Sequence, residues 1–289
     1  MKNLSGLLIV LVLGLAACQP VASTPEPTEN TVAAPEETTS VVITTEMPAE
    51  TTDVITMTEE ATAVVTPTLE VCSPLQGFDQ ADLLARISNP FDPPAPGSDN
   101  PHQGVDLSDF DPADPNRIAV PGRTVQVALP GTVALVQTDR FPYGTAVIVE
   151  TPLETLPADL QAQFGDLAVW PPRSPNDPLT CPTVTPAPQY DASRRSVYIL
   201  YAHLSSMADL QVGEEVNCGQ TLGTVGQSGN ALAPHLHFEV RVGPAGARLG
   251  SLAHYDVSAS EPEMAAYCDW RVSGDFIWVD PLIVLNLVK

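Results

Sequence analysis

Three of the five histidines in this chain fall in short patterns with a carboxylate or with one another. His235 and His237 are two positions apart in a stretch, 236–242, that is typical of a β-strand. Residues i and i+2 of a strand project from the same face, so this spacing places two imidazoles side by side. Imidazole nitrogens are common ligands of divalent transition metals. The pair therefore predicts a metal site, provided that other ligands come close in the fold.

Further candidate ligands occur in His102-x-x-x-Asp106 and at His203. Catalytic zinc takes three protein ligands and keeps a fourth position open for water or substrate. Four histidines and one aspartate exceed that need, which leaves two histidines for proton transfer. Glu239 shares the strand face of the histidine pair, and we expect it to stand behind the ligands. His254 lies outside every pattern, and we expect it to be a solvated loop residue.

The elements that must position these residues are β-strands. Alternating apolar and β-branched residues, bounded by Gly, Pro and Asn, predict strands at 124–129, 132–137, 146–150, 196–204, 221–225 and 236–242. No βαβ rhythm is present, so the pattern indicates an all-β core of antiparallel strands. We expect one short helix at 79–87. The proline-rich stretch 151–195 and the stretch 243–274 interrupt the strand pattern, and we interpret both as long loop insertions.

The net charge indicates which partners fit the chain, and the cysteine content bears on its cellular compartment. The formal net charge is −23, and beyond residue 70 the chain still holds 25 acidic against 11 basic residues. This balance argues against nucleic acid or anionic lipid as the main partner. Besides Cys18, four cysteines remain in a chain that we expect to be exported. Two disulfides are plausible, and the spacing leaves all three pairings open among Cys72, Cys181, Cys218 and Cys268.

The N-terminal part reads as a targeting segment and a tether. Residues 1–18 combine a short basic start with an apolar run too short to span a bilayer comfortably, which is typical of a signal peptide. Leu15-Ala-Ala-Cys18 resembles the lipobox of bacterial lipoproteins, whose cysteine is lipidated; ordinary cleavage near Ala17 is the alternative. Residues 19–70 hold ten acids, no base and no aromatic residue, so we expect a disordered tether. The predicted location is extracytoplasmic, with lipid anchoring to a bacterial membrane.

Three motifs in a fixed order carry a resemblance to a known family. They are His102-Gln-Gly-Val-Asp106, Leu200-Tyr-Ala-His203, and Pro234-His-Leu-His-Phe-Glu239. Together they resemble the motifs of the lysostaphin-type (LytM, M23) zinc metallopeptidases. Residues 211–226 are similar to the Gly-rich hairpin of that family, and 279–282 resembles its usual ending.

The resemblance covers about residues 100–242 and implies a fold. We expect a domain at 71–289 in which antiparallel sheets form a narrow groove, as in LytM and other duplicated hybrid motifs. Its core would be 100–242 plus 275–289, with the insertions at about 151–195 and 243–274. The sequence indicates no oligomeric state.

The resemblance also implies roles for the motif residues. His102, Asp106 and His237 would bind one zinc ion, and His203 and His235 would be the catalytic residues beside the bound water. Zinc lowers the pKa of a bound water to about 7, so a neighbouring histidine can take its proton near neutral pH. Which histidine performs which step stays open.

Known substrates of the family are the peptides of bacterial cell walls. The leading hypothesis is therefore a zinc endopeptidase that cleaves cross-links or stem or bridge peptides of peptidoglycan. The alternative is a non-catalytic LytM-type module that binds the wall or activates an amidase; such modules usually lack some ligands. A third possibility is a zymogen in which residues 89–100 or an insertion block the groove.

Overall fold

The computed structural model describes residues 69–111, 113–165, 167, 179–183 and 190–286. All of these belong to one compact unit. The expected signal peptide with its lipidated Cys18, and nearly all of the expected tether, lie outside the described residues. No helix in the described part of the chain is long and apolar enough to cross a membrane.

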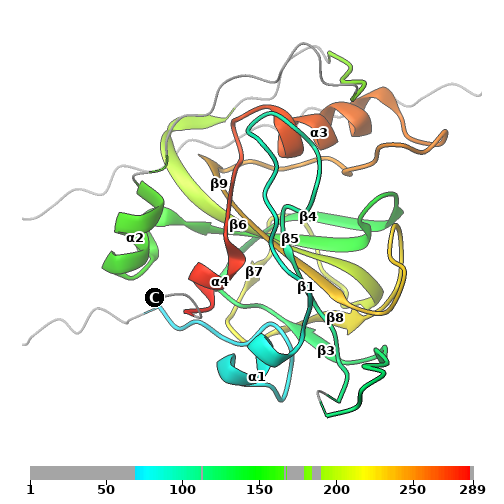
Figure 1. Ribbon diagram of the computed structural model, residues 1–289. Coiled ribbons are helices and arrows are strands. Elements are labelled where there is room, and N and C mark those ends of the chain that lie inside the picture. The colour runs from blue at the N-terminus through cyan, green and yellow to red at the C-terminus, as the bar shows by residue number, and fades with distance from the viewer. Residues whose placement is uncertain (1–68, 112, 166, 168–178, 184–189, 287–289) are drawn as a thin grey trace, which may run out of the picture. The chain divides into compact units, whose positions relative to one another are not determined.

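Strands dominate the described part of the chain (Figure 1). They are β1 (Ile87–Asn89), β2 (Val105–Leu107), β3 (Thr124–Gln126), β4 (Gly131–Arg140), β5 (Gly144–Pro152), β6 (Asp191–Met207), β7 (Glu215–Val216), β8 (Thr221–Val225), β9 (Leu236–Ala245) and β10 (Ile277–Val279). The helices are α1 (Gln80–Ala85), the 3-10 turn η1 (Leu153–Thr155), α2 (Ala158–Gly165), α3 (Glu261–Val272) and α4 (Pro281–Val284).

The strands form one sheet in the order β1-β2-β9-β6-β5-β4-β7, with β10 on β9 and with β8 joining β3 to β6. Each of these pairings is antiparallel, which confirms the expected fold class. The register of β9 decides where the site forms, because it sets Asp106 of β2 and Ala202 of β6 on either side of His237. Within 211–226 the expected hairpin is wrong: β7 pairs with β4, whereas β8 pairs with β3 and β6.

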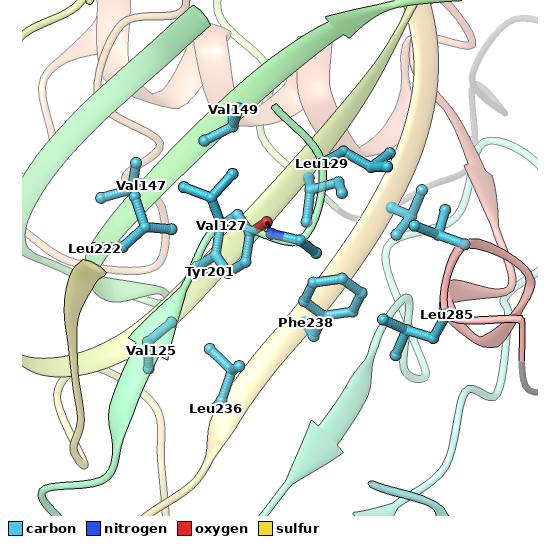
Figure 2. Close-up of a cluster of buried hydrophobic side chains, with 14 of the residues drawn as sticks. Val125, Val127, Leu129, Val147, Val149, Tyr201, Leu222, Leu236, Phe238 and Leu285 are labelled. Carbon is cyan, nitrogen blue, oxygen red and sulfur yellow. Dashed lines mark hydrogen bonds between the residues drawn. The ribbon is translucent and has the colours of Figure 1, made fainter. Parts of the chain in front are cut away.

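The central strands are buried on both faces. Along β5, Val147 and Val149 belong to one apolar cluster, whereas Ala146 and Ile148 belong to a second cluster. This is the period of two that a strand imposes on its side chains. Figure 2 shows the first cluster, in which Phe238 of β9 lies with side chains from β3, β5, β6 and β8. Burial of a side chain such as Phe238 stabilises the fold by about 1.5–3 kcal/mol.

The same alternation places the polar residues of β9. Leu236, Phe238, Val240 and Val242 face the first cluster, so 235, 237, 239 and 241 must face the opposite side. On that side the second cluster contains buried residues of α3. The four polar positions of this strand end are therefore directed toward α3 and the segments that pack with it.

Both insertions contain regular structure, so the interpretation of them as loops is wrong in part. The stretch 151–195 includes the end of β5, η1, α2 and the start of β6, and 243–274 includes α3. Ser260 and Glu263 form a capping box at the start of α3, a local signal that favours a helix. The short helix predicted at 79–87 is confirmed as α1, which begins with a capping box on Asp79.

Two disulfides are present, as expected, and the structure assigns the pairing. Cys72 pairs with Cys218, and Cys181 pairs with Cys268. The second bond ties the described segment 179–183 to α3. The Cys72–Cys218 bond excludes a metal role for the group formed by these two thiols and Glu70, because metal binding needs free thiolates.

Candidate metal centre

One groove, with a volume of about 1090 Å³, collects the chemistry-bearing residues. Its lining includes Asp106 and all four motif histidines, His102, His203, His235 and His237. His237 belongs to β9 and Asp106 to β2, and the two residues lie directly opposite each other in the antiparallel register. The strand pairing thus brings together residues that are 131 positions apart in the sequence.

Three side-chain atoms converge at the floor of this groove. Asp106 Oδ1 lies 2.9 Å from His237 Nδ1 and 3.1 Å from His102 Nε2. The two histidine nitrogens are 3.2 Å apart. Zinc bonds of about 2.0–2.1 Å at tetrahedral angles put ligand atoms about 3.3–3.4 Å apart. The donor types and their spacing therefore fit one zinc ion with a fourth position open.

Hydrogen bonds behind the ligands fix which nitrogen faces the site. His102 Nδ1 lies 2.8 Å from the backbone oxygen of Pro90, and His237 Nε2 lies 3.2 Å from a carboxylate oxygen of Glu239. Oxygen acceptors require a proton on those nitrogens, so the opposite nitrogens carry the free lone pairs. Asn89 donates a hydrogen bond of 3.2 Å to Asp106 Oδ2, which leaves Oδ1 for the site.

Electrostatics within the cluster support an ionised aspartate. Burial raises the pKa of Asp106, but its interactions with His102 and His237 outweigh it and hold the pKa far below its usual range. Burial lowers the pKa of His237, and the bonds to Asp106 and Glu239 outweigh it and raise the pKa to about 9. Without a cation, the cluster thus favours a proton on His237, which balances the buried carboxylates. A metal ion would supply the same positive charge.

His203 and His235 lie beside the three converging atoms. The two rings are 4.7 Å apart, and His235 Nε2 is 3.5 Å from Asp106 Oδ1. Each Nδ1 donates to a backbone oxygen at 2.8 Å, Ser228 for His203 and Ala233 for His235. The tautomer that these bonds favour has its proton on Nδ1 and its lone pair on Nε2.

The backbone and the surroundings hold His203 in an unusual state. Its φ is +63°, a left-handed conformation that costs free energy outside glycine and is frequent at functional sites. Burial, with repulsion from His237 and His235, lowers its pKa to about 3. His203 is therefore neutral near pH 7, and its Nε2 carries a lone pair.

A buried charged network supports the ligand His237 from behind. Glu239 lies behind His237, as expected; it is fully buried and accepts hydrogen bonds from Tyr143 at 2.9 Å and from Arg241 Nε at 2.5 Å. Arg271 of α3 lies 3.4 Å from the same carboxylate and binds Asp99 through Nε at 2.6 Å. Burial raises the pKa of Glu239, but the guanidinium of Arg241 and the bond to His237 outweigh it and keep the carboxylate ionised.

Sequence reasoning missed several members of this network, namely Asn89, Asp99, Tyr143 and Arg271. None of them occurs in a motif, and Arg271 lies in the stretch 243–274, which the strand pattern predicts to be a loop. The capping box of α3 was the one local signal that could have placed Arg271 on a helix.

The expectation that His254 is solvated is wrong. It is 5% exposed, its Nε2 donates to the backbone oxygen of Thr180 at 2.7 Å, and its Nδ1 accepts from the N–H of Tyr255 at 2.9 Å. Its ring also packs against Tyr267 of α3. The insertion folds back onto the protein, so His254 is a structural residue outside the ligand cluster.

The fold and the site together define an antiparallel β protein with a three-ligand candidate metal centre at strands β2 and β9 and the segment before β2. Comparison with protein families agrees with this class, because residues 191–249 match the model of Peptidase family M23. That segment carries His203, His235 and His237, and it ends before α3. No curated protein matches the chain.

Solved structures with similarity to the chain include peptidases. The catalytic domain of lysostaphin from Staphylococcus simulans is 17% identical, with 69% of this chain and 89% of that one covered and a TM-score of 0.33. A mutant catalytic domain of the prophage-encoded M23 protein EnpA from Enterococcus faecalis is 18% identical, with 56% and 84% covered and a TM-score of 0.32. A zinc-containing peptidase from Vibrio cholerae is 18% identical, with 60% and 36% covered and a TM-score of 0.32. Similarity at this level is low.

Proposed function

We propose that this protein is a zinc-dependent endopeptidase that cleaves peptides of bacterial peptidoglycan, at cross-links or within stem or bridge peptides. The observation that carries the proposal is the cluster of His102 Nε2, Asp106 Oδ1 and His237 Nδ1, 2.9–3.2 Å apart in an open groove. The match of residues 191–249 to Peptidase family M23 supports peptide hydrolysis.

The site residues would have two kinds of role, metal binding and proton transfer. His102, Asp106 and His237 would hold one zinc ion, which supplies a Lewis acid for a peptide carbonyl and lowers the pKa of water. His203 and His235 would hold or move protons at Nε2, because their Nδ1 atoms are occupied by backbone carbonyls. The lowered pKa of His203 keeps its ring neutral at neutral pH.

Two rival interpretations make different claims about the same groove. A non-catalytic wall-binding or amidase-activating module would tolerate the loss of ligands, whereas here the three-ligand set is complete. The zymogen interpretation has an insertion or residues 89–100 block the groove. These residues instead build the site, since Asn89 donates to Asp106, and Asp92 exchanges two backbone hydrogen bonds of 2.9 and 3.0 Å with His102. We therefore do not retain this segment as a cover.

The test compares ligand and proton-transfer variants of the purified full chain. We expect about one zinc per chain, with Asp106→Ala and His237→Ala losing both zinc and cleavage of cross-linked wall material. His203→Ala and His235→Ala should keep zinc and lose cleavage, and the exposed Asp209→Ala should keep both. Cleavage is measured by mass spectrometry, which detects peptides with newly released amines. Zinc-loaded wild type that binds wall fragments and releases no amines would favour the non-catalytic module.

We also propose that the protein is held outside the cytoplasm by a lipid on Cys18, with residues 19–70 as a tether to the peptidase domain. The lipobox-like Leu15-Ala-Ala-Cys18 supports this proposal. A membrane is then a partner through the anchor, and the wall peptide is the partner in the groove. Cys18→Ser should leave the membrane fraction, and retention there would contradict the anchor.

A further inference from the structure

Among the described residues, no unpaired acidic side chain lines the groove, although the chain is strongly acidic. The net charge is −23, yet the acidic residues among the described groove lining are Asp99 and Asp106. Asp99 is bound by Arg271 and by the hydroxyl of Tyr267, and Asp106 is bound by histidines. An anionic substrate would therefore meet no free carboxylate from the described residues inside the groove.

One arginine of the groove lacks a carboxylate partner. Six arginines of the described chain form ion pairs with acidic side chains, namely Arg123, Arg140, Arg194, Arg241, Arg248 and Arg271. Arg117 lines the groove, is exposed, and forms no ion pair with the described residues.

The guanidinium of Arg117 is nevertheless held in place. It stacks on the ring of Phe110 at 4.2 Å and donates one hydrogen bond of 3.1 Å to the backbone oxygen of Ile87. A guanidinium has five N–H donors arranged to match a carboxylate with two parallel bonds. Stacking and the single backbone bond leave enough donors of Arg117 for such a carboxylate, and they reduce the entropy lost when it binds.

The strand register gives the separation of Arg117 from the metal cluster. Ile87 of β1 lies opposite Leu107 of β2, which is the neighbour of Asp106. Paired strands are about 5 Å apart and successive residues about 3.3 Å apart, so the guanidinium lies roughly 10 Å from the ligand cluster. An extended peptide covers that distance in about three residues.

Two exposed apolar side chains line the same groove as the arginine. Ile118 is 67% exposed and Leu232 is 99% exposed, and both line the groove. The loop of Leu232 is close to β2, since Ser108 Oγ bonds to the backbone oxygen of Pro234 at 3.4 Å. Apolar side chains that line a groove can contact the apolar part of a ligand.

We propose that Arg117, with Ile118 and Leu232 beside it, forms a subsite for a substrate residue that carries a free carboxylate, about three residues from the bond that is cut. The inference deepens the proposed function and rests on it, because it defines which wall peptides the groove accepts. Arg117 acts here as a specificity residue, distant from the reacting atoms. A wall peptide with an amide in place of this carboxylate is the poorer substrate.

The test measures the cleavage of two substrates by the zinc-loaded full chain, as wild type and with two different replacements of Arg117. The substrates are the peptide that the wild type releases from wall material, made synthetically across the cut bond, and its copy with the nearby carboxylate replaced by a carboxamide. Arg117→Gln should lower kcat/KM about fivefold on the carboxylate peptide, mainly through KM, and leave the carboxamide peptide unchanged. Arg117→Lys should recover part of the loss. Arg194→Gln removes another exposed arginine, away from the groove, and should change neither.

The outcomes separate this inference from the proposed function. Equal losses on both peptides with Arg117→Gln, or no preference of the wild type for the carboxylate, overturn the subsite. If the wild type cuts no wall material, the proposed function fails. The subsite is then tested by calorimetry, which measures the binding of a known wall stem peptide and of its carboxamide copy. Tighter binding of the carboxylate form that depends on Arg117 supports the subsite, and equal binding of both overturns it.

Discussion

Replacing Glu239 with glutamine should weaken the metal centre without touching a ligand atom. The carboxylate accepts from His237 Nε2 at 3.2 Å and thereby keeps the lone pair on Nδ1 directed at the cluster. A neutral glutamine can present either its oxygen or its NH₂ group to that ring. The amide oxygen would keep the proton on Nε2 of His237 through a weaker hydrogen bond, whereas the NH₂ group would oppose that tautomer. The ring therefore loses its fixed orientation.

The size of the effect follows from which partners remain. Arg271 keeps Asp99 as a counter-ion at 2.6 Å, whereas the other partners of Arg241 are a backbone oxygen of Phe276 and the side chain of Gln103. Glu239→Gln therefore leaves the charge of Arg241 buried without a carboxylate. Removing one partner of a buried ion pair costs about 3–5 kcal/mol. Loss of the hydrogen bond behind a metal-binding histidine weakens metal binding about 10–100-fold.

The assay measures both quantities on the same protein. Zinc affinity comes from competition with a chromophoric chelator, and the free energy of unfolding comes from urea denaturation of the zinc-free chain. Glu150→Gln is the matched control, because Glu150 is also buried and bonded, to Arg248 at 2.5 Å and to Ser196 at 2.8 Å, but touches no histidine. We expect both variants to lose stability and only Glu239→Gln to lose zinc affinity. Unchanged zinc affinity in folded Glu239→Gln would refute the role assigned to this carboxylate.

Three further predictions concern pH, covalent constraint and close packing. Burial raises the pKa of Glu150, but bonds from the Gly246 N–H and Arg248 outweigh it and lower the pKa. Its contribution, about 1–3 kcal/mol, should therefore be present at neutral pH and disappear as the pH falls below about 4.5, so denaturation curves of wild type and Glu150→Gln should converge in acid. Replacing the Cys181–Cys268 disulfide by serines should cost about 4–5 kcal/mol, because the bond closes a loop of 87 residues; an unchanged Tm would contradict this. Gly104→Ala should lower zinc affinity about tenfold, since the added Cβ would lie 2.8 Å from His237 Cε1, whereas Gly165→Ala, with open space around it, should not.

Much of the β framework could be predicted from the sequence because its signal is local. Residues 221–225 form a strand with the predicted bounds, and β5 and β9 extend the predicted strands by a few residues at their ends. Alternation of apolar and polar side chains reports directly which face of a strand is buried. It also placed Glu239 behind His237, where the structure has it.

The support behind the ligands could not be predicted, because its partners are distant in sequence. Arg271 meets Asp99 across 172 positions and Tyr143 across 128. No periodicity connects such residues, and only the packing of α3 brings them together. The burial of His254 has the same cause: a loop residue is solvated or buried according to what the insertion folds against.

The three candidate ligands differ in how firmly the backbone holds them. Asp106 and His237 belong to paired strands, whereas His102 lies before β2 and is held by one isolated bridge with Asp92. Short bridges open far more often than central strands, by local unfolding. We therefore expect the off-rate of the metal to follow the opening of this bridge, so that hydrogen exchange at the amides of Asp92 and His102 and the release of zinc share one rate-limiting event.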